Sequence, residues 1–334
     1  MTLGAKAVSP PGYDIAFGIH DRKPTLFGSK ATMARVTVVY LWRKVNDPRY
    51  AHAFFRSISQ FAAGEDFDFV FAVKGYGAGE LPPFAAKIDH VPASTTKVMH
   101  FTDDQTPLTV FRAVSKVCGT EFILSFNSWS RILAPNWLKS YLAAFETVPD
   151  CGLVGASGGY ETVWDQPFPN IGIRSNAFMI RTDLFNSLEP GNLATVAGDH
   201  LLEAGPNGMT KQIMARGLQP VIADRFGNAW QAKDWPRSRT FRLGEQEGLL
   251  IADNRTNQYA CGSRRKRGRL VARCWGPGAK AKPGSMARKF LEWLWWNYPR
   301  GPIDIYPDAM AKFGEILAKL TGRPPKPRST VFPN

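Results

Sequence analysis

Runs of apolar residues, each ended by a polar cluster, recur along the first two thirds of the chain. Val36 to Trp42 (VTVVYLW), Phe67 to Val73 (FDFVFAV) and Phe122 to Phe126 (FILSF) are apolar or nearly so throughout. Uninterrupted runs of this length suit strands that are buried on both faces of a parallel sheet. Further strands are predicted at Val98 to Phe101, Leu153 to Ala156, Asn170 to Arg181 and, as the last of the set, Val221 to Ala223.

Segments with apolar residues at helical spacing lie between these runs. Tyr50 to Ala62 and Leu108 to Val117 each carry an apolar stripe, and Pro135 opens a third such segment that reaches Phe145. Proline is favoured in the first turn of a helix. A fourth helix is predicted after Pro206-Asn207. The alternation of strands and helices predicts an α/β fold whose mostly parallel sheet is flanked by helices.

The net charge of +14 is concentrated at one end of the chain. From Arg255 onward there are 17 Lys or Arg and 4 Asp or Glu, whereas the preceding residues hold 25 and 24, so the two parts carry +13 and +1. The 44% hydrophobic and 21% charged residues of the 334-residue chain are typical of a globular protein. The basic character therefore belongs to a tail.

The sequence lacks the usual marks of membrane insertion and export. No apolar run reaches the roughly 18 residues of a spanning helix, and the first residues lack the apolar core of a secretory signal. The four cysteines form no CxxC pair and no usual zinc spacing, so we interpret them as reduced thiols. We expect a cytoplasmic protein.

We divide the chain into an extended arm (1–34), an α/β domain (35–260) and a basic, Trp-rich extension (261–334). The extension contains SRRKRGRLVAR (263–273) and a Trp-rich amphipathic segment (286–298). Basic residues beside tryptophans suit the anionic inner face of a membrane, so we expect peripheral membrane association through residues 263–298. Binding of nucleic acid is a less favoured alternative. A solvated basic face is another.

The polar cluster NSWSR (127–131) follows the predicted strand Phe122 to Phe126 directly. A buried strand, a polar turn and a helix place side chains at the carboxyl edge of an α/β sheet, where open sheets bind ligands. An ordinary strand-to-helix connection with a satisfied Asn is the other interpretation.

The order of four segments resembles the family 2 glycosyltransferases, which have a GT-A fold. The segments are VTVVYLWR, FDFVFAVKGYG, the stretch from FTDDQ to PNWL, and the stretch from GDHLLEAGPNG to PVIA. Within residues 35 to 260 the chain looks like a divergent bacterial branch associated with surface-polysaccharide synthesis. The resemblance implies transfer of a sugar, with inversion, from a nucleotide-sugar donor to a glycan or lipid-linked acceptor. A non-catalytic GT-A-like module that binds a glycan or a partner is the alternative.

The metal-binding DxD motif of that family is replaced here by Asn127-Ser128-Trp129. Neutral Asn and Ser oxygens are poor sole ligands for Mg²⁺, which prefers carboxylates and phosphate oxygens. We therefore predict metal-independent transfer, with a residual Mn²⁺ or Mg²⁺ site as the alternative. Cationic side chains can stabilise a leaving nucleoside diphosphate instead of a metal. The candidates are Lys74, Arg131 and Arg174.

Inverting transfer needs a carboxylate that takes the proton of the acceptor hydroxyl. The resemblance places this role at Asp199 or Glu203, which are four residues apart and face one side of a helical turn. We favour Glu203, just before the predicted helix start, and keep Asp199 as the alternative base or as a ligand of acceptor hydroxyls. The competing interpretation is that either carboxylate caps a helix or pairs with Lys211.

The remaining candidate residues are assigned to the donor. Tyr40 and Arg43 end the first strand, where stacking and hydrogen bonding can hold a nucleobase, although Tyr40 also suits simple packing. Asn127 and Ser128 stand at the motif position. Asp103 and Asp104 suit contacts with the donor base or sugar, but they equally suit solvation or N-capping of the next helix. Arg174 and Asn176 would lie on one face of a strand, where they could contact a diphosphate or sugar.

Overall fold

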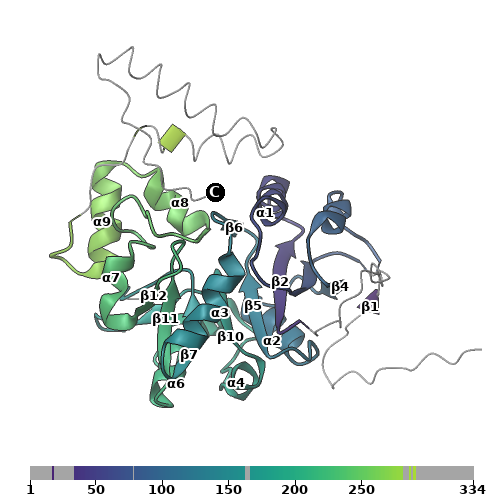
Figure 1. The fold of residues 1–334 in the computed structure, drawn as a ribbon, viewed down its shortest axis with the longest axis horizontal. Coiled ribbons are helices and arrows are strands. Elements are labelled where there is room, and N and C mark those ends of the chain that lie inside the picture. The colour runs from purple at the N-terminus through teal and green to yellow at the C-terminus, as the bar shows by residue number, and fades with distance from the viewer. Residues whose placement is uncertain are drawn as a thin grey trace, which may run out of the picture.

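The protein is described by a computed structural model that covers residues 17–18, 34–77, 79–161, 166–280, 286 and 289–290. In this part of the chain a nine-stranded sheet forms the centre of the molecule (Figure 1). In spatial order its strands are β1 (Phe17–Gly18), β4 (Thr95–Phe101), β3 (Asp68–Lys74), β2 (Val36–Arg43), β5 (Phe122–Phe126), β10 (Ala177–Arg181), β7 (Cys151–Gly155), β11 (Gln219–Ala223) and β12 (Ala229–Gln231).

The strands that position the candidate site run in one direction. Within the group β4, β3, β2 and β5 each pairing is parallel, and β7 pairs in parallel with β11. β10 is antiparallel to both β5 and β7, so β7 again runs in the direction of β5. The predicted α/β fold with a mostly parallel sheet is confirmed, and the carboxyl ends of the parallel strands meet at one edge of the sheet.

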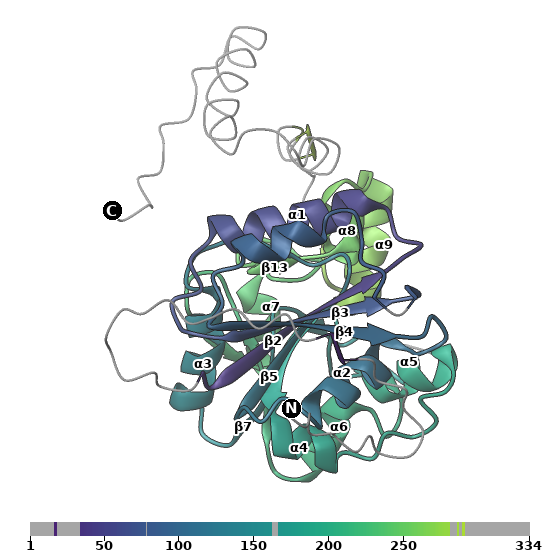
Figure 2. The same cartoon turned by 90° about the vertical axis from the view of Figure 1, so that its right-hand side faces the viewer.

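Helices cover both faces of the sheet (Figure 2). α1 (Pro48–Gln60) and α3 (Trp137–Thr147) pack on one face, where Phe54 and Trp137 join one core cluster. The other face is covered by α2 (Pro107–Ser115), α4 (Thr182–Ser187) and α6 (Met209–Ala215), with α5 (Val196–Ala204) packed against α2 and α6. The uninterrupted apolar runs follow from this arrangement, because nearly every residue of β2, β3 and β5 is buried between the two helical layers.

Aromatic packing fixes α1 against the first strands of the sheet. Tyr40 of β2 is fully buried, and its ring stacks on Phe54 of α1 with ring centroids 3.7 Å apart. The Phe71 ring of β3 is nearly parallel to the Tyr40 ring, with ring centroids 5.9 Å apart. Aromatic pairs contribute about 0.5–1.5 kcal/mol beyond the area that they bury. The stripe of α1 predicted from the sequence is thus the contact that joins this helix to β2 and β3.

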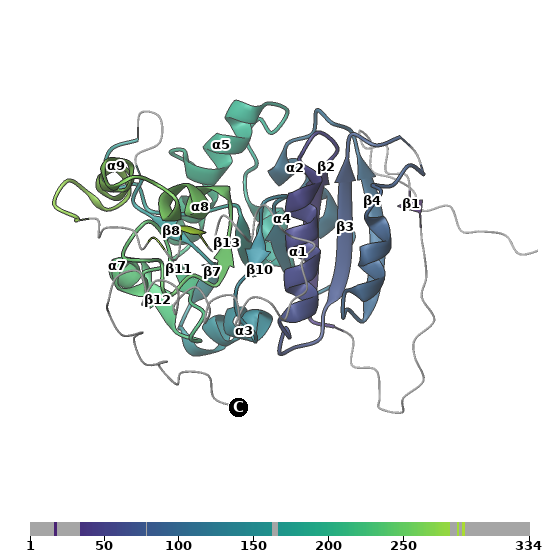
Figure 3. The same ribbon diagram turned by 90° about the horizontal axis from the view of Figure 1, so that it is seen from above.

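The segment after β12 lies at the β11–β12 end of the sheet and reaches back to β6 (Figure 3). It contains a short 3-10 helix, η2 (Ala232–Asp234), α7 (Trp235–Ser238), β13 (Ile251–Ala252), α8 (Asn254–Ala260) and α9 (Arg264–Trp275). β13 pairs with β6 (Arg131–Ile132), which directly follows the turn after β5. The division of the chain at residue 260 stays a prediction.

α9 is anchored by a buried cation. Arg267 is fully buried, and its Nη2 donates to the carbonyl of Gly244 at 2.6 Å and to Glu245 at 2.8 Å. Cys274 lies on the same inner side, and a Cβ at Gly159 would stand 2.5 Å from its Sγ. Glycine at 159 is therefore required for the close approach of this helix to β8 (Gly158–Gly159).

Three predicted elements differ from the structure. Asn170 to Arg181 is not one strand, because the chain forms β9 (Gly172–Ile173), turns, and then forms β10. The turn arises where the Arg174 N–H donates to the Ser157 carbonyl beside β8. Val221 to Ala223 is not the last strand, since β12 and β13 follow it.

The third difference concerns Pro135, which precedes the helix that it was predicted to open. Asn136 takes a left-handed conformation with φ 57°, and the helix begins at Trp137. Asn tolerates this conformation better than most residues. The Asn136 N–H donates to the Ala62 carbonyl, which ties this break to the end of α1. The predicted N-terminal arm (1–34) and the Trp-rich segment (286–298) lie outside the described residues, except for positions 17–18, 34, 286 and 289–290.

Replacing Phe54 with Ala is expected to lower the free energy of unfolding by about 3–5 kcal/mol, because it removes a buried ring and leaves a cavity beside Tyr40. Urea titration followed by circular dichroism measures the loss. Phe226→Ala is the matched control, because that ring is 63% exposed and its removal is expected to change stability by no more than about 0.5 kcal/mol. Equal effects of the two substitutions would contradict this account of the core.

Candidate functional site

Two charged side chains meet across the carboxyl ends of β2 and β4. Arg43 closes β2 and Asp103 follows β4. The guanidinium donates twice to the carboxylate, from Nε to Oδ1 at 2.6 Å and from Nη2 to Oδ2 at 2.7 Å. Hydrogen bonding from Arg43 lowers the pKa of Asp103. Gly75 follows β3 with φ 77°, and a Cβ there would stand 3.2 Å from Asp103 Oδ1, so glycine permits this pair to form.

Lys74 lies beneath this ion pair at the end of β3. Its residue is 6% exposed, and its Nζ donates to the Gln105 carbonyl. Burial is the largest cause that lowers the pKa of Lys74, and the neighbouring Arg43 lowers it further. The carboxylates of Asp103 and Asp199 act in the opposite direction. The predicted donor residues Arg43, Lys74 and Asp103 are therefore brought together.

Asp104 is exposed next to this group, and hydrogen bonding from Thr102 lowers its pKa. Neither Asp103 nor Asp104 caps the following helix, because Thr106 occupies the N-cap position of α2. The alternative that Asp103 or Asp104 caps this helix is therefore excluded. A backbone N–H in the first turn of α2 is instead bound by a carboxylate from elsewhere in the chain.

Asp199 supplies that carboxylate. It lies in the first turn of α5, is 7% exposed, and its Oδ1 accepts the Leu108 N–H of α2 at 2.9 Å. Burial raises the pKa of Asp199, while the hydrogen bonds from Leu108 and Thr106 oppose the rise. The carboxylate thus reaches the start of α2 and lies in the electrostatic field of Lys74. The predicted alternative of helix capping is correct for Asp199, although the capped helix is α2.

Glu203 lies one turn later in the same helix and faces different partners. Its Oε1 accepts the Ser175 N–H at 3.0 Å, and its Oε2 lies 3.9 Å from His200 Nδ1. Burial favours the neutral acid, but His200, Arg174 and the Ser175 amide together lower the pKa of Glu203 to about 2. The residue lies in the last turn of α5, and α6, the helix predicted after Pro206-Asn207, follows at Met209. Lys211 binds Gln166 and pairs with neither carboxylate.

Arg174 and Asn176 lie in the turn between β9 and β10, so they do not share a strand face. The Arg174 guanidinium lies 3.8 Å from the buried carboxylate of Asp253 and 4.9 Å from the centre of the Phe241 ring. Asn176 is buried, and its Oδ1 accepts from Ser157 Oγ at 3.1 Å. Arg174 is therefore held by the later segment that contains β13 and α8. The sequence around Arg174 does not indicate these contacts.

The residues at the position of the DxD motif form a turn. Asn127 Oδ1 accepts from the Trp129 N–H at 3.0 Å and from Ser130 Oγ at 3.1 Å. Ser128 is 4% exposed, and its Oγ donates to the Leu41 carbonyl at 2.8 Å. Arg131, 1% exposed, opens β6 directly after this turn.

This turn does not fit a divalent cation. The Asn127 side-chain oxygen already accepts two hydrogen bonds, and the Ser128 hydroxyl is buried against β2. Neither residue supplies a carboxylate, which is the ligand that Mg²⁺ and Mn²⁺ prefer. Among the residues that the structure describes, no three His, Cys, Asp or Glu side chains are grouped so that they could hold a metal ion.

Tyr40 does not reach the candidate site. Its ring is enclosed by Phe54, Phe55 and Phe71, and its hydroxyl donates to the Ser128 carbonyl at 3.2 Å. The prediction that Tyr40 stacks on a nucleobase is corrected, because the residue is 0% exposed. The packing alternative holds.

An aromatic pair and an ion-pair cluster were missed by the sequence interpretation. Half-buried Trp129 packs edge-on against Tyr50 at the start of α1, with ring centroids 6.4 Å apart. Near Arg174, the Glu161 carboxylate forms ion pairs with Arg242 and Arg273, each with an N–O distance of 2.8 Å. These contacts join residues far apart in the chain, and no local pattern reveals them.

The described residues contain no disulfide, and all four cysteines are free thiols. Burial raises the pKa of Cys151 and of Cys274 to about 12, so neither is a reactive thiolate at neutral pH. No helix in the described ranges has both the length and the apolar character needed to cross a membrane.

Comparisons with known proteins were made at the level of sequence and of structure. No protein-family model and no curated protein matches the chain. Among solved structures the chain is similar to a mannosyltransferase from Pyrobaculum calidifontis in complex with GDP-Man and Mn²⁺. The two share 11% identity, the alignment covers 88% of this chain and 84% of that chain, and the TM-score is 0.42. For mouse xyloside xylosyltransferase 1 the identity is 12%, the coverage 56% and 84%, and the TM-score 0.37.

A third similar structure is a CMP:2-keto-3-deoxy-manno-octonic acid synthetase complexed with CTP. It shares 12% identity, with 57% of this chain and 91% of that chain covered and a TM-score of 0.35. Likenesses at these TM-scores carry no argument about function. The α/β fold rests on the strand order itself, and membership of family 2 stays a prediction.

Replacing Glu203 with Gln is expected to lower the pKa of His200. The Glu203 carboxylate raises the pKa of His200 above its ordinary value of 6.5, so the stability that protonated His200 contributes is present below pH 6.5 and is lost as the pH rises through the raised value. NMR titration of the imidazole measures both states. His100, whose pKa is lowered by burial in β4, is the internal control. An unchanged His200 titration in the variant would contradict the interaction.

Proposed function

We propose that the chain is a glycosyltransferase that moves a sugar from a nucleotide-sugar donor to a glycan or lipid-linked acceptor. The observation that carries the proposal is the group formed by Arg43, Lys74 and Asp103 at the carboxyl ends of parallel strands. β3, which follows β2 in the chain, lies on one side of β2, and β5 lies on the other side of β2, so the strand order reverses at β2. Ligands of open α/β sheets bind at this kind of reversal in strand order.

The proposed donor site supplies positive charge where a nucleoside diphosphate would leave. Lys74 is a buried cation, and such a group interacts more strongly with a phosphate than a fully solvated one does. The guanidinium of Arg43 is held in one orientation by Asp103, and the Arg43 side chain is 45% exposed. We propose that these two residues stabilise the departing diphosphate and that transfer needs no metal. Arg174 is less suited to stabilise the diphosphate, because its positive charge already interacts with the carboxylates of Asp253 and Glu203.

Asp199 fits the role of general base better than Glu203. A general base works best when its pKa lies near the working pH. The pKa of Glu203 is about 2, because His200, Arg174 and Ser175 stabilise the carboxylate. Asp199 has a raised pKa and lies in the field of Lys74, which places it on the side of the proposed diphosphate site. We propose that Asp199 accepts the proton of the attacking hydroxyl and that Glu203 orients the turn between β9 and β10.

A membrane-bound acceptor is consistent with the outer side of α9. Arg264, Arg265 and Arg269 are exposed there and form no ion pair with any residue that the structure describes. Cationic side chains at the surface of an anionic membrane contribute about 1 kcal/mol each. We propose that this side binds the anionic inner face of a membrane, which would bring the enzyme to a lipid-linked acceptor used in polysaccharide synthesis.

A non-catalytic binding module remains the second candidate function. The specific observation in its favour is that Asn127 and Ser128 use their side-chain oxygens inside the protein. A protein of this kind would bind a glycan or a partner without turning over a donor.

A thermal-shift screen with UDP-, GDP-, CMP- and dTDP-sugars, with and without Mn²⁺, tests the donor site. One class of donor is expected to raise the melting temperature without metal by mass action. Lys74→Met is expected to weaken that binding by roughly tenfold, since it removes a charge-assisted contact of about 1.4 kcal/mol. Lys139→Met removes the same charge from an exposed position of α3 and is expected to leave binding unchanged.

Turnover of the donor that binds then separates the two functions. Asp199→Asn keeps an oxygen that can accept the Leu108 N–H, yet it is expected to lower kcat by about 10²–10⁴-fold without loss of donor affinity. Glu203→Gln is expected to have the smaller effect. Binding without turnover in the wild type would favour the non-catalytic module, and binding only with Mn²⁺ would refute metal independence.

Co-sedimentation with vesicles that contain phosphatidylserine tests the membrane proposal. Arg265→Ala combined with Arg269→Ala is expected to weaken binding by roughly tenfold or more at low salt, and high salt is expected to abolish the difference. Lys97→Ala combined with Lys139→Ala removes the same charge from other exposed positions. Equal loss in both double variants would show a net-charge effect and would contradict a role for α9.

A further inference from the structure

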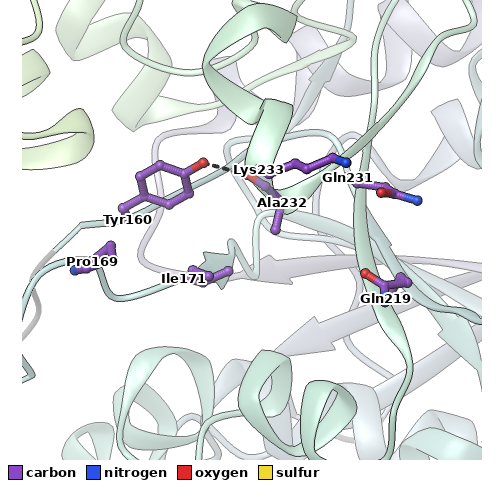
Figure 4. Close-up of a pocket in the computed structure, with 7 residues that line it drawn as sticks. All are labelled: Tyr160, Pro169, Ile171, Gln219, Gln231, Ala232 and Lys233. Carbon is purple, nitrogen blue, oxygen red and sulfur yellow. Dashed lines mark hydrogen bonds between the residues drawn. The ribbon is translucent and has the colours of Figure 1, made fainter.

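A cavity of about 470 Å³ lies at the other end of the sheet from the proposed donor site (Figure 4). Gln219 opens β11, and Gln231 closes the antiparallel strand β12 beside it. Because β11 runs parallel to β7, and β7 runs in the direction of β5, Gln219 marks the amino ends of the strands. The cavity is therefore separate from the carboxyl edge that holds Arg43 and Lys74.

One wall of the cavity is apolar and held in a fixed position. It is formed by Tyr160, Pro169, Ile171 and Ala232. The Tyr160 hydroxyl donates to the Ala232 carbonyl at 2.5 Å, so the ring is tied to η2. Trp275 packs edge-on against the same ring, with ring centroids 5.1 Å apart. An aromatic wall that is already fixed loses little conformational entropy when a ligand binds.

Three polar side chains complete the lining and lack partners in the described structure. Gln219 and Lys233 are exposed and Gln231 is half-buried. None of their side chains makes a hydrogen bond or an ion pair with a residue in the described ranges. Figure 4 shows the two carboxamides and the Lys233 side chain on one side of the opening, with Tyr160 and Pro169 on the other. The cavity thus combines a rigid apolar wall with unused donors and acceptors.

This combination matches the chemistry of a saccharide. A carboxamide donates and accepts hydrogen bonds, which is also what a sugar hydroxyl does. The C–H face of a sugar ring can pack on the apolar wall, and the volume lies within the ordinary range of small-ligand sites, about 300–1,000 Å³. A multiply charged anion would meet a single cation, Lys233, and a fully apolar ligand would leave the three polar groups without partners.

We propose that this cavity binds one or two sugar units of an uncharged saccharide, with Gln219 and Gln231 as its hydrogen-bonding residues and Tyr160 as its wall. The inference does not rest on the proposed glycosyltransferase activity, since it concerns binding at a different edge of the sheet. If that activity is established, the cavity would hold a part of the glycan remote from the reacting end.

Titration of ¹⁵N-labelled protein with methyl glycosides of glucose, galactose, mannose and N-acetylglucosamine, and with maltose, tests the proposal by NMR. At least one saccharide is expected to shift the side-chain amides of Gln219 and Gln231 and the backbone amides of Ile171 and Ala232. Gln219→Ala combined with Gln231→Ala is expected to weaken that binding roughly tenfold, because each lost hydrogen bond contributes about 0.5–1.5 kcal/mol. Both positions are at least partly exposed, so the variant is expected to fold.

Gln60→Ala is the matched control, since that carboxamide is exposed at the end of α1, and it is expected to bind as the wild type does. The proposal is overturned if no saccharide of the panel shifts these amides, or if the double variant binds as tightly as the wild type. It is also overturned if inorganic phosphate shifts the amides where the sugars do not, which would make the cavity an anion site. Because the readout is binding in the absence of any donor, its failure is distinct from a failure of the transferase proposal.

Discussion

The parallel pairing of β2 with both β3 and β5 is the constraint on which the candidate site depends. Every residue from Thr37 to Arg43 is in register with a residue of β3, so the strands end together at Arg43 and Lys74. The pairing with β5 brings the turn at Asn127 to the same edge. Parallel strands cannot be joined by a short hairpin, so α1 and α2 must cross between them, and they cover opposite faces of the sheet. The charged group at the edge is thus a consequence of strand pairing.

α5 links this edge to the rest of the molecule. Its two carboxylates are four residues apart but differ in electrostatic environment: Asp199 is buried against the start of α2, whereas Glu203 lies among His200, Arg174 and the Ser175 amide. Burial dominates at the first and stabilising partners dominate at the second, so their pKa values move in opposite directions. Such a separation of two nearby carboxylates is a common way in which a protein assigns different chemical tasks to similar groups.

The strands were predictable because burial on both faces leaves a continuous apolar run, as in Phe122 to Phe126. The prediction failed where tertiary contacts decide the local structure. The turn at Arg174 depends on the Ser157 carbonyl, and the sequence between residues 170 and 181 does not indicate this contact. Asp199 and Leu108 are 91 residues apart in the chain, so their hydrogen bond has no local signal. Tyr40 illustrates a different limit, because an aromatic residue near a strand end looks the same whether it packs inward or faces a ligand.

The burial of Arg267 has a consequence for the charge that surrounds it. One cation of the basic run points inward, where the Gly244 carbonyl and Glu245 hold it, so α9 cannot rotate about its axis without exposing Val271 and Cys274. The neighbouring arginines are therefore carried on a stiff frame with a defined direction, unlike the cations of a flexible basic tail. A stiff array of this kind discriminates between surfaces by their geometry as well as by their charge, because it cannot rearrange to follow an uneven one.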